Sequence, residues 1–153
     1  MAVMRALVLL FLVFSVENAA AEDCLFGWTP FGVECYKFFP NSVNWPTAEK
    51  NCEALDANLA SVRNKVLNDF LLSLIPAGTQ SGTWIAGQDG EVDGQWLWSD
   101  GSEFDYVNWC ANEPNNAGGP ENCIVINVGS NHCWNDMACS LTTSYICAQP
   151  MKS

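Results

Sequence analysis

The chain has 153 residues, of which 17 are Asp or Glu and 6 are Lys or Arg, and its formal net charge is -11 at pH 7. A chain this acidic repels phosphate backbones and anionic membranes, so nucleic acid is not expected as a partner. Composition leaves two interpretations of the carboxylates open: an acidic surface that favours solubility, or ligands for a hard cation such as calcium.

The first segment has the pattern of a secretory signal peptide. A positively charged start at residues 1–5 precedes an apolar run at residues 6–16, and Ala19 and Ala21 are small residues that suit a signal peptidase. The alternative, a membrane anchor, is disfavoured because the run is about half of the roughly 20 residues that a spanning helix needs. We therefore expect cleavage after Ala21 and a secreted, extracellular product without membrane insertion, in which residues 22–153 form a single domain.

The cysteine content indicates a disulfide-stabilised domain. An even number of cysteines in an exported chain of this size predicts four disulfides and a monomer without a free thiol, although spacing alone leaves the pairing open. Strand-like aromatic residues at 35–39 follow a Gly-containing turn at 31–33, so Cys24 and Cys35 can close a small hairpin. The cysteines are Cys24, Cys35, Cys52, Cys110, Cys123, Cys133, Cys139 and Cys147.

Two amphipathic helices are expected next. The first is predicted over residues 47–57, with Pro46 near its first turn, where a missing amide hydrogen does little harm. The second is predicted to begin after Asn64 as its N-cap and to end at Leu74. The predicted apolar faces are Ala48, Cys52, Leu55 and Leu59 for the first helix, and Val66, Leu67, Phe70, Leu71 and Leu74 for the second.

Beyond Gly78 the pattern changes to short strands joined by long connections rich in Gly and Asn. The strands are expected at residues 84–87, 95–98, 123–127 and 144–147. The predicted fold class is therefore α+β, with the helices first. The connection from Trp98 to Cys123 carries little secondary-structure signal, which in a compact domain indicates a functional loop.

This long loop and the segment after it contain an oxygen-rich set of side chains. Three carboxylates and two amide carbonyls form the kind of all-oxygen shell that calcium prefers. A cis bond before Pro114 would turn the side chains on both sides of it toward the same side of the loop. The set therefore predicts a calcium site, and the alternative is a degenerate loop with a purely structural role. Its members are Glu113, Asn115, Glu121, Asn135 and Asp136.

Glu-Pro-Asn at 113–115, the following Glu121 and Trp-Asn-Asp at 134–136 resemble the calcium and sugar site of the C-type lectin family. The resemblance extends from Cys24 to Cys147 and includes small soluble fish lectins and the related type II antifreeze proteins. It implies a C-type lectin-like fold with two helices, short antiparallel strands and a long calcium-binding loop. It also implies that one set of side chains binds both Ca2+ and two vicinal hydroxyls of a glycan or glycoprotein. That set is Glu113, Asn115, Glu121, Asn135 and Asp136.

The resemblance further implies a disulfide pattern and a second calcium site. Many members of the family carry that second site, but two of its positions hold amides here where the two-site lectins carry acids. We therefore expect the second site to be weak or empty. Its positions are Asp89, Asp93, Asn116 and Asn122, with Glu121 shared, and the implied disulfides are Cys24–Cys35, Cys52–Cys147, Cys110–Cys133 and Cys123–Cys139.

Family resemblance assigns the Glu-Pro-Asn tripeptide to mannose-type sugars, whose 3- and 4-hydroxyls are both equatorial, and Gln-Pro-Asp to galactose-type sugars. The loop at 116–120 also lacks an aromatic residue that would stack on galactose. Mannose-type specificity is therefore expected, with innate recognition of microbial glycans as one possible role. Non-covalent homo-oligomers are left open.

The main alternative is ice binding, because type II antifreeze proteins share the implied fold and the Cys-Trp-Asn-Asp run at 133–136. Their pattern includes a fifth disulfide, and its positions hold Gly90 and Asn122 here. The calcium-dependent members carry Gln-Pro-Asp in place of Glu-Pro-Asn. Both differences favour a lectin. A venom-type subunit is disfavoured because such chains usually carry an extra cysteine.

Two further residue types have an ordinary structural interpretation. The tryptophans in the strands or beside cysteines are expected in the core, with sugar stacking as the alternative. His132 stands beside Cys133 and is expected to be structural or exposed, with a zinc or catalytic role as the alternative. No nucleophile and base pair or Gly-rich phosphate loop is present, so an enzyme is not expected. The tryptophans are Trp84, Trp96, Trp98, Trp109 and Trp134.

Overall fold

The computed structural model describes residues 23–79, 81–116 and 122–152. The predicted signal peptide at 1–21 and the candidate ligand Glu121 lie outside the described residues. Over the ranges just given, no helix combines the length and the apolar character needed to span a membrane.

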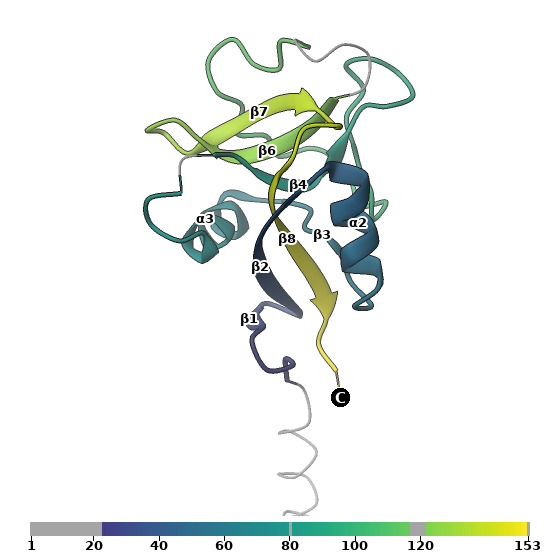
Figure 1. The fold of residues 1–153 in the computed structure, drawn as a ribbon, viewed down its shortest axis with the longest axis vertical. Coiled ribbons are helices and arrows are strands. Elements are labelled where there is room, and N and C mark those ends of the chain that lie inside the picture. Colours follow the sequence, from purple (N-terminus) through teal and green to yellow (C-terminus); the bar gives the residue numbers. More distant parts are fainter. Residues whose placement is uncertain (1–22, 80, 117–121, 153) are drawn as a thin grey trace, which may run out of the picture.

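The described residues form two helices and one eight-stranded sheet, which confirms the α+β class (Figure 1). The strand order is β1-β2-β8-β4-β6-β7, with β3 paired to β8 and β5 paired to β4. All pairs are antiparallel except β4 with β8, so the sheet is mixed. The elements are β1 (Thr29–Phe31), β2 (Glu34–Val43), α2 (Trp45–Glu53), β3 (Asn58–Leu59), α3 (Lys65–Leu74), β4 (Thr83–Gln88), β5 (Leu97–Trp98), β6 (Asn122–Val128), β7 (Cys133–Ala138) and β8 (Thr143–Pro150).

Side-chain caps set where both helices begin. The Asn64 side chain accepts a hydrogen bond from the Leu67 amide at 2.8 Å, and α3 covers the predicted range. The Asn44 side chain accepts one from the Thr47 amide at 3.0 Å, so α2 begins before the predicted position, with Pro46 in its first turn.

The prediction that two helix residues lie in the core is wrong. Leu55 is 44% exposed because α2 ends at Glu53, which removes Leu55 from the helical stripe. Val66 is 67% exposed in the first turn of α3, whereas Leu67 and Leu71 are buried. Helical spacing therefore identified the buried face of each helix but not the residues at which that face begins and ends.

The strand predictions differ from the structure at β5 and β7, and the two-residue strand β3 was not predicted either. The expected strand at 95–98 is reduced to β5, and β7 forms where no strand was expected. Strand β7 contains Asn135 and Asp136, whose polarity hides the strand pattern in the sequence. It forms because it pairs with β6 over the register from Asn122↔Ala138 to Val128↔Cys133.

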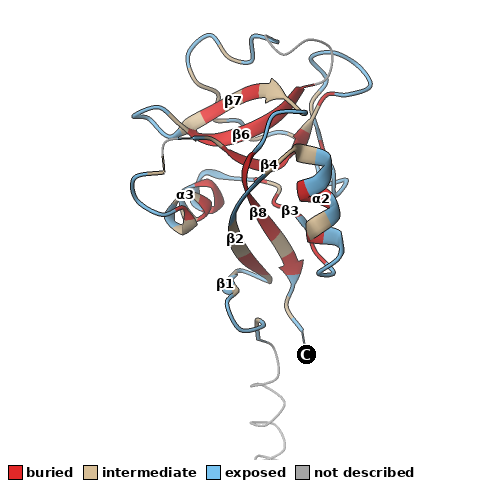
Figure 2. Ribbon diagram, in the orientation of Figure 1, coloured by how far each residue is buried: buried red, intermediate tan, exposed pale blue. Residues whose placement is uncertain are grey.

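The core lies around β4, β6 and β8, which are buried over most of their length (Figure 2). Among the five tryptophans expected in the core, Trp84, Trp98 and Trp134 are buried and the other two are half-buried. The structure joins the eight cysteines in the pairs that the family resemblance implied, and Cys52–Cys147 connects α2 to β8 inside the core. The bonds are Cys24–Cys35, Cys52–Cys147, Cys110–Cys133 and Cys123–Cys139.

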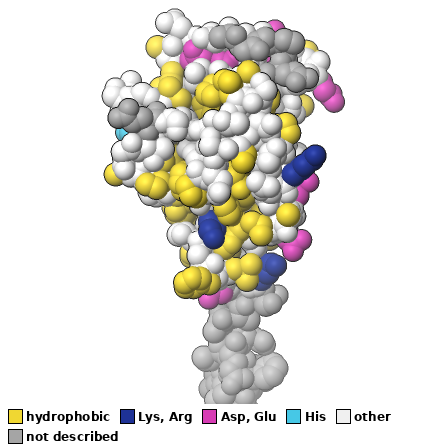
Figure 3. All heavy atoms as spheres, viewed as in Figure 1, with side chains coloured by type: hydrophobic (Ala, Val, Ile, Leu, Met, Phe, Trp, Pro, Cys, Tyr) yellow, Lys and Arg dark blue, Asp and Glu magenta, His cyan; other side chains and the backbone are white. Residues whose placement is uncertain are grey.

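The two ends of the described chain meet at one end of the molecule. Backbone hydrogen bonds of 3.1 and 3.2 Å join Asp23 and Lys152. The described part of the long loop between β5 and β6, residues 99–116, lies at the opposite end (Figure 1). Figure 3 shows acidic side chains at that end, whereas the visible Lys and Arg side chains lie away from it.

Candidate functional site

The long loop is fixed along β7 before it reaches the Glu-Pro-Asn tripeptide. The amide of Cys110 donates to the Trp134 carbonyl, and the amide of Trp134 donates to the Asn108 carbonyl, each at 2.8 Å. The Cys110–Cys133 disulfide, with a Cα–Cα distance of 5.0 Å, adds a covalent link. These contacts place the tripeptide beside the strand that carries Asn135 and Asp136.

Aromatic rings of the loop pack against Trp134 of β7, a cluster that the sequence pattern did not predict. The Trp134 ring lies 5.8 Å from each of the rings of Trp98, Tyr106 and Trp109, in edge-to-face geometry. The Trp134 indole N–H donates to the buried Asn68 side chain at 2.8 Å. The number of aromatic residues in the loop was the available signal, but their common contact with Trp134 depends on tertiary structure.

The Asp136 carboxylate organises the loop backbone. Its side chain is nearly buried, with 3% of the residue exposed. One oxygen accepts the amide hydrogen of Asn115 at 3.0 Å, and the other accepts that of Asn116 at 2.7 Å. Charge-assisted hydrogen bonds of this kind are roughly twice as strong as neutral ones. Asp136 therefore holds the tripeptide against β7.

Glu113 and Asn115 lie on the same side of the loop. The Glu113–Pro114 peptide bond is cis, the arrangement considered in the sequence analysis. The Asn115 side-chain amide donates to Glu113 Oε1 at 2.7 Å. Three of the five candidate ligands, Glu113, Asn115 and Asp136, are thus brought together.

The carboxylates of Glu113 and Asp136 interact unfavourably when both are ionised. Burial raises the pKa of Glu113 above its usual value, and the hydrogen bond and negative charge of Asp136 raise it further. None of the ion pairs formed within the described residues involves either side chain. A bound cation would stabilise both ionised carboxylates.

Two buried oxygen atoms test whether the site fits a metal ion. Within the described part of the chain, Glu113 Oε2 and Asn135 Oδ1 are buried and accept no hydrogen bond. Buried acceptors without donors are rare in folded proteins because each costs desolvation free energy. A hard cation would satisfy both atoms, so the donor set fits calcium.

Carboxylates alone do not define this site. Among the described residues, no group of three or more His, Cys, Asp or Glu side chains is placed to hold a metal. Only two of the four described candidate ligands are carboxylates, and the other two, Asn115 and Asn135, are amides. The third carboxylate of the predicted set, Glu121, lies outside the described residues.

The four residues of the implied second site also lie together. Asp89, Asp93 and Asn116 line a cavity of about 210 Å³. The side chain of Asn116 donates to Asp93, and the backbone amide of Asn122 donates to Asp89. The carboxylates at this position are therefore already engaged by amides of the protein.

His132 lies in the turn between β6 and β7 and is exposed. Its Nδ1 is 2.6 Å from the Asn127 side-chain oxygen, and it lines a cavity of about 280 Å³ with Thr79, Asn127 and Gly129. None of the candidate calcium ligands lines this cavity among the described residues. These contacts agree with a structural or exposed role.

The fold is that of a C-type lectin domain, and the sequence comparison agrees. Residues 41–149 match the family model described as Lectin C-type domain, so the chain belongs to this family. It is 46% identical over 129 residues to ladderlectin from Oncorhynchus mykiss, which covers 83% of this chain and 67% of the relative. The family is one of non-enzymatic binding domains, which confirms that the protein is not an enzyme.

Solved structures share the fold. Herring type II antifreeze protein has a TM-score of 0.79 at 36% identity, covering 84% of this chain and 100% of that one. The cow C-type carbohydrate-recognition domain of CD23, solved in the presence of a GlcNAc2Man3 oligosaccharide, has a TM-score of 0.77 at 32% identity, with coverages of 86% and 99%.

Family membership alone does not decide calcium use or ligand. Type II antifreeze proteins of this fold include a Ca2+-dependent form and a calcium-independent form. Nattectin from Thalassophryne nattereri, 35% identical over 137 residues and covering 88% of this chain and 86% of the relative, is named a galactose-specific lectin. The particular function therefore depends on the chemistry of the site.

Proposed function

We propose that this protein is a secreted lectin that binds glycans through one calcium ion. The observation that carries the proposal is the pair of buried oxygens, Glu113 Oε2 and Asn135 Oδ1, that accept no hydrogen bond within the described residues. Secretion after cleavage behind Ala21 is supported by four disulfides, which form in oxidising compartments. The proposed ligands are Glu113, Asn115, Glu121, Asn135 and Asp136.

The side chains of the tripeptide would orient the sugar. When bound, calcium would accept one lone pair from each of two vicinal sugar hydroxyls. Glu113 can only accept a hydrogen bond, whereas the Asn115 amide can donate one, so the two residues present opposite polarity to the two hydroxyls. The bond between Asn115 and Glu113 at 2.7 Å keeps both side chains at the same edge of the loop.

Glu-Pro-Asn supports mannose-type sugars as the ligand class, namely mannose, fucose or N-acetylglucosamine. The CD23 domain, a structural neighbour, was solved in the presence of a mannose-containing oligosaccharide. The galactose-specific name of nattectin shows that relatives of similar identity differ in ligand, so the sugar class needs a direct test.

The test is competition on a sugar column. Calcium-loaded protein bound to mannose-agarose is expected to elute with free mannose at about a tenfold lower concentration than with free galactose, because one well-placed polar contact is worth a kcal/mol or more. The double change Glu113→Gln with Asn115→Asp reverses the polarity of the tripeptide and should weaken this preference. Preferential release of the unchanged protein by galactose would contradict the sugar class while leaving calcium binding intact. Failure to bind any sugar column with calcium would contradict the lectin function.

Ice binding is the second candidate, favoured by the similarity to herring type II antifreeze protein over 84% of this chain. The same calcium-loaded sample separates the two functions, because an ice-binding protein gives thermal hysteresis and a lectin gives none. The Glu-Pro-Asn tripeptide supports the lectin.

A further inference from the structure

We propose that Asn116 is a positioning residue. Its side-chain amide links neighbouring segments at the end of the molecule that carries the long loop, and these hydrogen bonds take the place of a second calcium ion. The amide contacts two segments far apart in the sequence, the β4–β5 connection and the start of β6. It keeps the backbone beside the proposed calcium site in place whether or not calcium is bound.

Three hydrogen bonds place Asn116 at the centre of this arrangement. Its side-chain nitrogen donates to Asp93 Oδ2 at 2.8 Å, and its side-chain oxygen accepts from the Asn122 side-chain amide. Its backbone amide donates to Asp136 Oδ2 at 2.7 Å. One residue therefore connects the β4–β5 connection, β6 and β7.

Asp89 adds one side-chain hydrogen bond to β6 and one within the β4–β5 connection. It is 2% exposed, and its two carboxylate oxygens accept the backbone amides of Asn122 at 3.0 Å and Gly94 at 3.1 Å. Both Asp89 and Asp93 thus obtain donors from the protein itself. A cation at this position would share these oxygens with N–H donors that already compensate part of their charge.

An amide is required at position 116 because the side chain must donate and accept at once. An asparagine does both, whereas an ionised aspartate only accepts and would face the Asp93 carboxylate as a like charge. The backbone of Asn116 has a φ of 57°, in the left-handed region that asparagine tolerates better than most residues. Both the backbone and the hydrogen bonds therefore select asparagine.

The arrangement does not depend on the proposed function, because it consists of bonds within the protein. It leads to two expectations. First, the unchanged protein takes up one calcium ion per chain and not two. Second, the contribution of Asn116 to stability is present in a chelator. Failure of the proposed function, seen as no calcium uptake at all, leaves the second expectation fully testable.

The experiment compares melting in EDTA and in excess CaCl2 for the full secreted protein and three variants, together with calcium stoichiometry by calorimetry. In EDTA, Asn116→Asp is expected to lower the melting temperature by about 2 °C or more, because it breaks the exposed bond to Asp93 and adds a like charge. In excess calcium the same variant should bind one more ion per chain than the unchanged protein. Asn116→Ala should melt lower in both solutions and gain no ion.

Asn112→Asp is the matched control. Asn112 lies in the same loop with a φ of 66°, and it is exposed, so the same chemical change is made in the same backbone conformation without breaking these contacts. Its melting temperature in EDTA should stay within about 1 °C of the unchanged protein. An Asn116→Asp variant that melts with the control in EDTA, or two calcium ions per unchanged chain, would overturn the proposal.

Discussion

Asp136→Asn is expected to lower calcium affinity about a hundredfold or more and to abolish retention on mannose-agarose. Asp136 is both a proposed ligand and the acceptor for two backbone amides of the loop, at 3.0 and 2.7 Å. An asparagine can accept at one of these positions, but its NH2 group would face an N–H donor at the other. The change therefore removes a ligand charge and releases part of the loop backbone.

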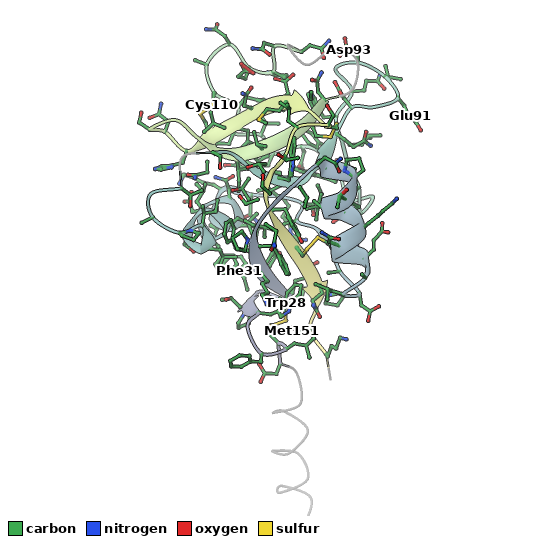
Figure 4. The ribbon with its side chains drawn as sticks, viewed as in Figure 1. Trp28, Phe31, Glu91, Asp93, Cys110 and Met151 are labelled. Carbon is green, nitrogen blue, oxygen red and sulfur yellow. A yellow bond between two sulfur atoms is a disulfide. The ribbon has the colours of Figure 1, made fainter. Side chains whose placement is uncertain are left out.

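Calcium titration by calorimetry measures this effect, with Glu91→Gln as the control. Glu91 is exposed on the β4–β5 connection at the same end of the molecule, so the control removes one negative charge without touching the proposed ligands (Figure 4). The control should bind calcium within about threefold of the unchanged protein, because exposed charges act weakly through water. Equal affinities for Asp136→Asn and Glu91→Gln would show that Asp136 is not a calcium ligand.

Replacing Cys52 and Cys147 together by alanine is expected to have the largest effect on stability. Their bond spans a sequence separation of 95 residues, and both cysteines are fully buried. The chain-entropy model gives about 4 to 5 kcal/mol for a loop of this length. At a few degrees for each kcal/mol, the melting temperature should fall by about 10 °C or more.

The Cys24–Cys35 bond offers the comparison within the same chain, because its sequence separation is 11 residues. The same model gives about 3 kcal/mol for its removal. Thermal unfolding should therefore rank the Cys52/Cys147 double variant below the Cys24/Cys35 double variant. The reverse order would show that closure of the long loop does not control stability. Non-reducing mass spectrometry checks that the remaining three disulfides are formed in each variant.

The sequence by itself determined the features that depend on neighbours in the chain. Asn64 caps α3 because its side chain reaches an amide three residues ahead, a contact that spacing alone reveals. Helical spacing likewise located Leu67 and Leu71 on the buried face of α3. The motif at Glu113 and Asn115, together with the family resemblance, indicated a set of oxygen ligands before any distance was known.

Tertiary structure decided the features that depend on contacts between distant segments. Strand β7 is hidden in the sequence because its polar residues are stabilised by pairing with β6, not by an apolar alternation. Asn116 was assigned in the sequence only to an implied second calcium site. Its bonds to Asp136 and Asp93, 20 and 23 residues away along the chain, instead make it a link between segments. No local pattern specifies such bonds, because their free energy arises only after the sheet has brought the segments together.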